Sequence, residues 1–238
     1  MRKWKLAEQY IDRSILINPL YVRAYDAKIN YVIHATGDME KARTVLKEAL
    51  NHIQSNELIE TRVIVEFLSR KYLKALKILQ EYQKKGNKLE DMENLWWKGF
   101  CSLFAEKIEL SNSYFDSLRE LGEKAIQKNP KDWKGQFYLA MAYSRLGKIK
   151  DAIKTANIAT NLMPVSLDAL YGSFQRIVLV EVYGTAREFD KAIDELDYIL
   201  SIPSPFSVNL VKKHPFFDPL RDNPRFQKLI KKYEQTEG

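Results

Sequence analysis

The sequence has few of the residues on which most enzyme sites depend. Its 238 residues include one cysteine, three histidines and nine scattered glycines. A single cysteine excludes an internal disulfide, and histidine is the usual metal ligand and general base. His34, His52 and His214 are far apart in the sequence and in no metal-binding spacing, so we expect structural or surface roles for them.

Motifs that carry chemistry are missing as well. The chain has no glycine-rich phosphate loop of the GxxxxGK[ST] or GxGxxG type and no serine in a nucleophile elbow. The acidic pairs Glu90/Asp91 and Asp194/Glu195 are typical of an ordinary helix surface. We therefore predict that the protein is not an enzyme and that it has no catalytic residues, no metal site and no cofactor.

Long apolar runs are also absent. The sequence has no stretch of about 18 apolar residues, the length needed to span a membrane. The basic start MRKWKLAEQY lacks the apolar core of a signal peptide. We expect a cytoplasmic protein, with the alternative that the chain is a fragment of a longer, membrane-anchored one.

The sequence is instead rich in amphipathic helix signals, most clearly over residues 133–164. Gly147 divides this stretch into two helices, and Pro130 and Pro164, which bracket it, lie 34 residues apart. Apolar or small residues recur there at i, i+3 and i+4, the spacing of one helix face: Leu139, Ala140, Tyr143, Ala152, Ala156 and Ala159. A period of 34 residues is that of a repeat built from two helices.

This stretch resembles a tetratricopeptide repeat (TPR). A residue equivalent to Ala152 returns at intervals of 35, 33, 43, 34 and 40, as Ala7, Ala42, Ala75, Leu118, Ala152 and Ala192. We predict a half repeat over residues 1–19 and about five helix pairs up to residue 206. The resemblance implies an all-α fold, a right-handed superhelical solenoid of antiparallel helix pairs.

The units differ in their turns and lengths. Gly37 lies in the turn of the second unit, whereas Arg70 stands at the glycine position of the weaker third unit. In the fourth and sixth units we predict long first helices, over residues 89–110 and 166–186. The half unit at the start either caps the array or is the remnant of a longer protein, and we expect the remnant.

The proline-rich residues 207–238 are predicted to form a separate capping segment that ends in a short basic helix. Prolines 215, 219 and 224 prevent a long helix here. Phe216, Phe217, Leu220 and Phe226 could anchor the segment over the last repeat. The stretch DPLRDNPRFQKLIKK is similar to the closing segment of TPR arrays in bacterial signalling proteins, namely nucleotide cyclases, serine/threonine kinases and transcriptional regulators.

The resemblance also implies a function. In the TPR family the first helices line a groove that binds peptides or partner helices, so we expect a non-catalytic protein–protein interaction module, the regulatory part of a larger bacterial signalling protein. The matching groove positions are Arg23, Asp26, Asn30, Asn94, Trp97, Lys98, Lys134, Phe137, Tyr138, Met141, Arg145, Tyr171 and Gln175, of which Gln175 is the weaker candidate. Aromatic and cationic side chains would suit an extended segment with apolar and acidic residues.

Simpler interpretations of these positions stay open. Trp97, Phe137 and Tyr138 could serve packing between repeats, and Arg23, Lys134 and Arg145 could be plain solvent-exposed cations. The lysine and asparagine arrangement with which chaperone-binding TPRs hold a terminal carboxylate is not reproduced. The partner is an unidentified protein or peptide, and a homodimer through an exposed terminal repeat is a further expectation.

An alternative function comes from charge. Residues 70–88 contain seven basic residues and one acidic residue, which could meet an acidic partner or nucleic acid phosphates. A solvated outer helix face is the simpler interpretation. No aromatic residues alternate with these cations as base stacking would require, so we do not expect nucleic acid.

Overall fold

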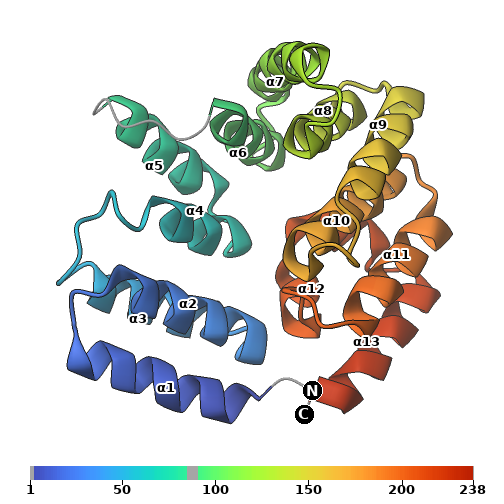
Figure 1. Cartoon of the computed structure of the whole chain (residues 1–238). Coiled ribbons are helices and arrows are strands. Elements are labelled where there is room, and N and C mark those ends of the chain that lie inside the picture. Colours follow the sequence, from blue (N-terminus) through green and yellow to red (C-terminus); the bar gives the residue numbers. More distant parts are fainter. Residues whose placement is uncertain (1–2, 85–90, 238) are drawn as a thin grey trace. The chain divides into compact units, whose positions relative to one another are not determined.

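Helices make up most of the chain. The structure is a computed structural model that describes residues 3–84 and 91–237, and within them no strand occurs. The helices are α1 (Trp4–Ile17), α2 (Val22–Thr36), α3 (Met39–Ala49), α4 (Ile59–Leu68), α5 (Tyr72–Lys84), α6 (Asp91–Phe104), α7 (Ile108–Lys128), α8 (Trp133–Arg145), α9 (Ile149–Leu162), α10 (Ala169–Thr185), α11 (Phe189–Ser201), α12 (Val208–Lys213), the 3-10 helix η1 (Pro215–Leu220) and α13 (Pro224–Glu237) (Figure 1).

The chain forms two compact units. Of the described residues, unit 1 contains 3–84, 207–215 and 233–237, and unit 2 contains 91–206 and 216–232. In unit 1, α1 packs on α2, and the pairs α2–α3 and α4–α5 follow; unit 2 contains the pairs α6–α7, α8–α9 and α10–α11. The predicted all-α array of a single helix and five helix pairs is confirmed. The division into an array over 1–206 and a cap over 207–238 stays a prediction.

Each helix pair turns at a residue with a positive φ. Gly37 and Gly147 have φ angles of 66° and 76°, and the same conformation is adopted by Arg70 (62°), Glu106 (60°) and Arg187 (59°). A left-handed residue closes the end of a helix, and glycine adopts this conformation at least cost. The expected turn glycines are confirmed at two pairs, while the other three use larger residues.

The predicted long first helix over residues 89–110 is wrong. α6 ends at Phe104, and the extra length lies in α7, which has 21 residues. The left-handed Glu106 ends α6, and the Lys107 N–H donates to the Ser102 carbonyl at 2.9 Å. Because no glycine marks this turn, the sequence carries no clear signal for it. The long first helix of the sixth unit is confirmed, since α10 has 17 residues.

The recurring small residues lie where the two helices of a pair approach. Ala42, Ala75, Ala152 and Ala192 each have no exposed surface, and neither has Leu118, which replaces alanine in the fourth unit. Ala7, on the unpaired α1, is half-buried. A side chain without exposed surface at this position is therefore shared by all five pairs.

The C-terminal segment is divided between the two units. In unit 1, α12 packs on α2, and Asn209 Nδ2 donates to the carbonyls of His34 and Ala35 at 3.2 and 2.9 Å. In unit 2, α13 lies beside α11, because Arg225 binds Asp190 and Asp194 at 2.6 and 2.7 Å. The basic residues of the predicted short helix thus pair with an acidic face of the last repeat.

Candidate functional site

The described residues offer little for covalent or metal chemistry. They contain no group of three or more His, Cys, Asp or Glu side chains that could hold a metal ion. Cys101 is completely buried, and burial raises the pKa of its thiol to about 12. The protonated thiol is a poor nucleophile at neutral pH. None of the described helices has the length and apolarity that a membrane span needs.

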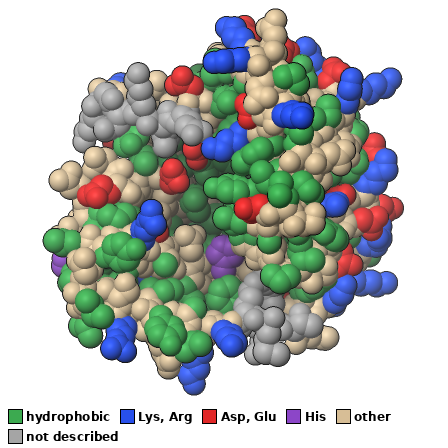
Figure 2. Space-filling view, viewed as in Figure 1, with side chains coloured by type: hydrophobic (Ala, Val, Ile, Leu, Met, Phe, Trp, Pro, Cys, Tyr) green, Lys and Arg blue, Asp and Glu red, His purple; other side chains and the backbone are tan. Residues whose placement is uncertain are grey.

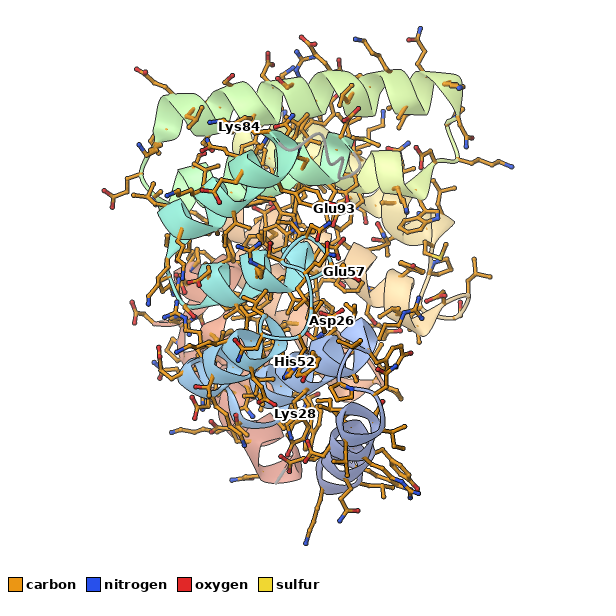
Figure 3. All side chains as sticks on the ribbon, turned by 90° about the vertical axis from the view of Figure 1, so that its left-hand side faces the viewer. Asp26, Lys28, His52, Glu57, Lys84 and Glu93 are labelled. Carbon is orange, nitrogen blue, oxygen red and sulfur yellow. The ribbon has the colours of Figure 1, made fainter. Side chains whose placement is uncertain are left out.

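In unit 1 the predicted groove residues Arg23 and Asn30 are both exposed on α2. They are seven residues apart and therefore share one face of the helix. Two other polar residues of α2, labelled in Figure 3, are engaged within the unit: Asp26 accepts a hydrogen bond from Thr61, and Lys28 binds Glu8 and Asp12 of α1 at 3.1 and 2.7 Å. Arg23 and Asn30 thus remain the accessible predicted residues of this unit.

Several predicted groove residues of unit 2 are buried. Asn94, Trp97 and Lys98 on α6 are at most 9% exposed, and Met141 on α8 has no exposed surface. Burial lowers the pKa of Lys98, whose Nζ lies 5.8 Å from the Tyr114 ring centroid. In this structure these side chains lie among the packed helices of the unit.

One face of α6 carries an aromatic cluster that the sequence analysis missed. Trp96, Phe100 and Phe104 are four residues apart and lie on the same side of the helix. We call these three residues the α6 aromatic face. The ring centroid of Phe137, on α8, lies 6.4 Å from that of Trp96. The i, i+4, i+8 spacing of bulky rings was the available sequence signal.

The chain's own C-terminal segment covers this face. The ring of Phe216, in η1, lies 4.5 Å from Phe100, 6.0 Å from Trp96 and 6.3 Å from Phe104, measured between centroids. On α10, Phe174 receives a second such ring, with 5.3 Å between its centroid and that of Phe206. Two first helices of unit 2 therefore hold phenylalanines supplied from outside the repeats.

Other first-helix residues of unit 2 are exposed or half-buried. Tyr171 on α10 is 45% exposed and its ring centroid lies 5.2 Å from that of Trp133 on α8. Lys134 Nζ lies 5.9 Å from the Trp133 centroid, and the rings of Phe137 and Tyr138 are 5.0 Å apart. Lys134 and Tyr171 are exposed, whereas Trp133, Phe137 and Tyr138 are half-buried. We call these five residues, after their two exposed members, the exposed cluster. It brings together four of the predicted groove residues, Lys134, Phe137, Tyr138 and Tyr171.

Arg145 lies at the other end of α8 and has an internal partner. Its guanidinium forms an ion pair with Glu181 of α10, and its Cζ lies 5.1 Å from the Phe100 ring centroid. Glu181 is 2% exposed. Burial raises the pKa of the Glu181 carboxyl, and the charge of Arg145 partly opposes this rise. The pair links two first helices of unit 2.

The basic residues between 70 and 84 are spread over α5 and the turn before it. Lys74 binds Glu66 at 2.6 Å, and Lys77 lies 3.8 Å from Glu81. Lys85 and Lys88 lie outside the described residues. On the face of the molecule in Figure 2, basic and acidic side chains are interspersed.

A family model matches one of the helix pairs. Residues 121–154 match the model of the tetratricopeptide repeat, a window from the end of α7 through α8 to the start of α9. The chain is similar to a solved structure described as YrrB, a TPR protein with an unusual peptide-binding site, at 15% identity over 94% of this chain and 97% of that one, with a TM-score of 0.39. No curated protein matched. The chain therefore contains a tetratricopeptide repeat at residues 121–154.

Proposed function

We propose that this chain is a non-catalytic module that binds a segment of a partner protein on the first helices of unit 2. The observation that carries the proposal is the exposed cluster on α8 and α10. Soluble proteins usually bury large aromatic side chains or use them for binding, and rigid aromatics with a neighbouring cation are typical of the residues that dominate protein interfaces. Leu167 and Leu170, which are 69% and 48% exposed, extend this apolar surface on the α10 side.

The expected ligand is an extended segment with aromatic and acidic side chains. The neighbouring helix faces already accept Phe206 and Phe216 from stretches outside any α-helix, so rings on an irregular backbone fit this surface. Lys134 is exposed and could pair with a carboxylate of the ligand, since charge-assisted hydrogen bonds are the stronger ones.

The proposal can be tested by selecting peptides from a random library on phage against the immobilised chain and measuring their affinities by fluorescence polarisation. We expect enrichment of peptides with aromatic and acidic residues. The variant Lys134→Glu, Tyr138→Ala, Tyr171→Ala should weaken binding by at least about tenfold, which is 1.4 kcal/mol. Arg145 stays unchanged, because its substitution would disturb the fold.

A matched control carries the changes Lys150→Glu, Lys154→Glu and Asn157→Ala on the exposed side of α9. It should retain the parent's affinity. If the control and the test variant bound the selected peptides equally well, the exposed cluster would not be the binding site.

We further propose a setting for the module. The resemblance of DPLRDNPRFQKLIKK to the tails of TPR arrays in bacterial signalling proteins supports a regulatory part of such a protein, acting in the cytoplasm. A cyclase, kinase or DNA-binding domain encoded in the same gene would support this setting, and a gene without one would argue against it.

We also propose self-association through α1. Leu6, Tyr10 and Ile17 share one face of this helix and are 43%, 65% and 73% exposed, an apolar surface of the kind that dimers bury. We expect a dimer in sedimentation experiments, which Tyr10→Ser together with Ile17→Ser should convert to a monomer. A variant that remained dimeric, or a parent that was monomeric at all concentrations, would contradict the idea.

A further inference from the structure

Unit 1 contains a cleft bordered by α3, α4 and α5. It has a volume of about 660 Å³. Its lining includes five cationic side chains, two carboxylates and three aliphatic side chains. The cleft is formed by the second helices α3 and α5 and by the first helix α4, and none of the candidate residues on α2, α6, α8 and α10 discussed above lines it.

One of the two carboxylates is already neutralised. The Glu66 side chain is 5% exposed and binds Arg43 Nη2 at 2.6 Å and Lys74 Nζ at 2.6 Å. Glu81 lies at the rim, 3.8 Å from Lys77. Two cations bind Glu66, so this buried acid does not cancel the positive charge of the cleft.

Other cationic groups of the lining have no carboxylate partner among residues 3–84 and 91–237. Lys47 is exposed on α3, and Arg62 on α4 donates only to the Ser55 carbonyl, at 3.0 Å. The Nε–H of Arg43 is buried without an acceptor in the described part of the chain. A buried donor without an acceptor is unfavourable, so an anionic group that reached it would be stabilised.

The cleft also has an apolar component. Leu46 and Ile78 are each 6% exposed, and Leu50 is 37% exposed at the edge. A ligand that was only anionic would leave this surface in water, whereas a ligand with an aliphatic side chain would cover it and be stabilised by the burial of apolar area.

We propose that this cleft binds an acidic segment of a partner protein that carries aliphatic side chains. Its carboxylates pair with Lys47, Arg62 and the rim residue Lys77, and its aliphatic side chain packs on Leu50. Nucleic acid fits less well, because none of the described residues that line the cleft is aromatic and could stack on a base. The proposal does not depend on the exposed cluster and stands or falls separately from it.

The experiment uses the full chain and a fluorescein-labelled peptide in which glutamate and leucine alternate with serine spacers. We expect saturable binding that weakens as salt is added, because exposed charges are screened. The variant Lys47→Glu, Lys77→Glu should weaken binding by about tenfold or more. Leu50→Ser should weaken it as well, which a purely electrostatic contact would not.

Three comparisons decide the outcome. Lys150→Glu with Lys154→Glu on α9 makes the same change of net charge outside the cleft and should leave the affinity unchanged. A peptide with glutamine in place of glutamate should not bind. The proposal would be overturned if the two charge variants lost affinity equally, or if the glutamine peptide bound. It would also be overturned if the glutamate peptide did not bind at all, or if an oligothymidylate bound more tightly and displaced it.

Discussion

Replacing Arg145 with methionine is expected to lower the free energy of unfolding by about 3–5 kcal/mol, because it leaves Glu181 buried without its cation. Glu181 is 2% exposed, and Thr185 Oγ1 also donates a hydrogen bond to its carboxylate at 3.1 Å. Methionine retains the aliphatic length of arginine, so the cavity is small and the loss reports mainly the uncompensated carboxylate. Urea denaturation followed by circular dichroism measures it.

The pH dependence tests this cause. The pKa of Glu181 is already raised above its ordinary value of 4.5 by burial, and loss of Arg145 raises it further. A carboxyl whose pKa is higher in the folded state than in the unfolded one destabilises the fold progressively as the pH rises above the unfolded pKa, and fully above the folded pKa. The loss in Arg145→Met should therefore be full at high pH and shrink as the pH falls through the raised pKa toward 4.5.

A double variant provides the control. Arg145→Met combined with Glu181→Leu removes both charges and should recover much of the lost stability, since apolar side chains can replace a buried ion pair at little cost. If the single variant lost the same stability at all pH values, and the double variant recovered none, packing and not charge would explain the effect.

The repeat pattern was predictable because it depends on local rules. A small residue early in each second helix and a turn between the two helices were visible in the sequence, and Ala42, Ala75 and Ala192 are fully buried as expected. The wrong prediction of one long helix over residues 89–110 also has a local cause. Glu106 adopts a conformation that normally selects glycine, so this turn carried no residue that identifies it.

The candidate site was harder to predict because it depends on helix rotation. Adjacent residues on an α-helix point about 100° apart, and the sequence analysis chose Trp97 where the structure buries Trp97 and turns Trp96 toward Phe137 and Phe216. The neighbours of a first helix also come from distant parts of the chain: Arg145 meets Glu181, and Phe216 meets Phe100. No local pattern encodes such pairs.

The second large effect is expected for Phe216→Ala. Phe216 is 7% exposed and contacts all three rings of the α6 aromatic face. Truncation of a buried phenylalanine to alanine typically costs about 3–5 kcal/mol. Because the ring is supplied by a short segment and not by the repeats, we expect this loss to release η1 from α6 while the helix pairs remain folded. Amide hydrogen exchange should become faster in residues 215–220.

Release of η1 from α6 should also change the affinity of the chain for a free peptide. In the parent chain the C-terminal segment is tethered and occupies the α6 aromatic face at an effective concentration in the millimolar range, so a free peptide with the sequence of residues 204–220 competes poorly. In Phe216→Ala the same peptide should bind at least about tenfold more tightly, since the internal competitor is weakened. Fluorescence polarisation of the labelled peptide measures this gain.

The variant Phe226→Ala is a control that distinguishes the release of η1 from α6 from a general loss of stability. Phe226 is 3% exposed and lies on α13, so its truncation should cost a similar free energy without uncovering the α6 aromatic face. Tighter peptide binding in Phe216→Ala but not in Phe226→Ala would mean that the C-terminal segment is a replaceable occupant of a binding surface on α6. Equal binding by the two variants would mean that Phe216 is an ordinary core residue and that the α6 aromatic face takes no ligand.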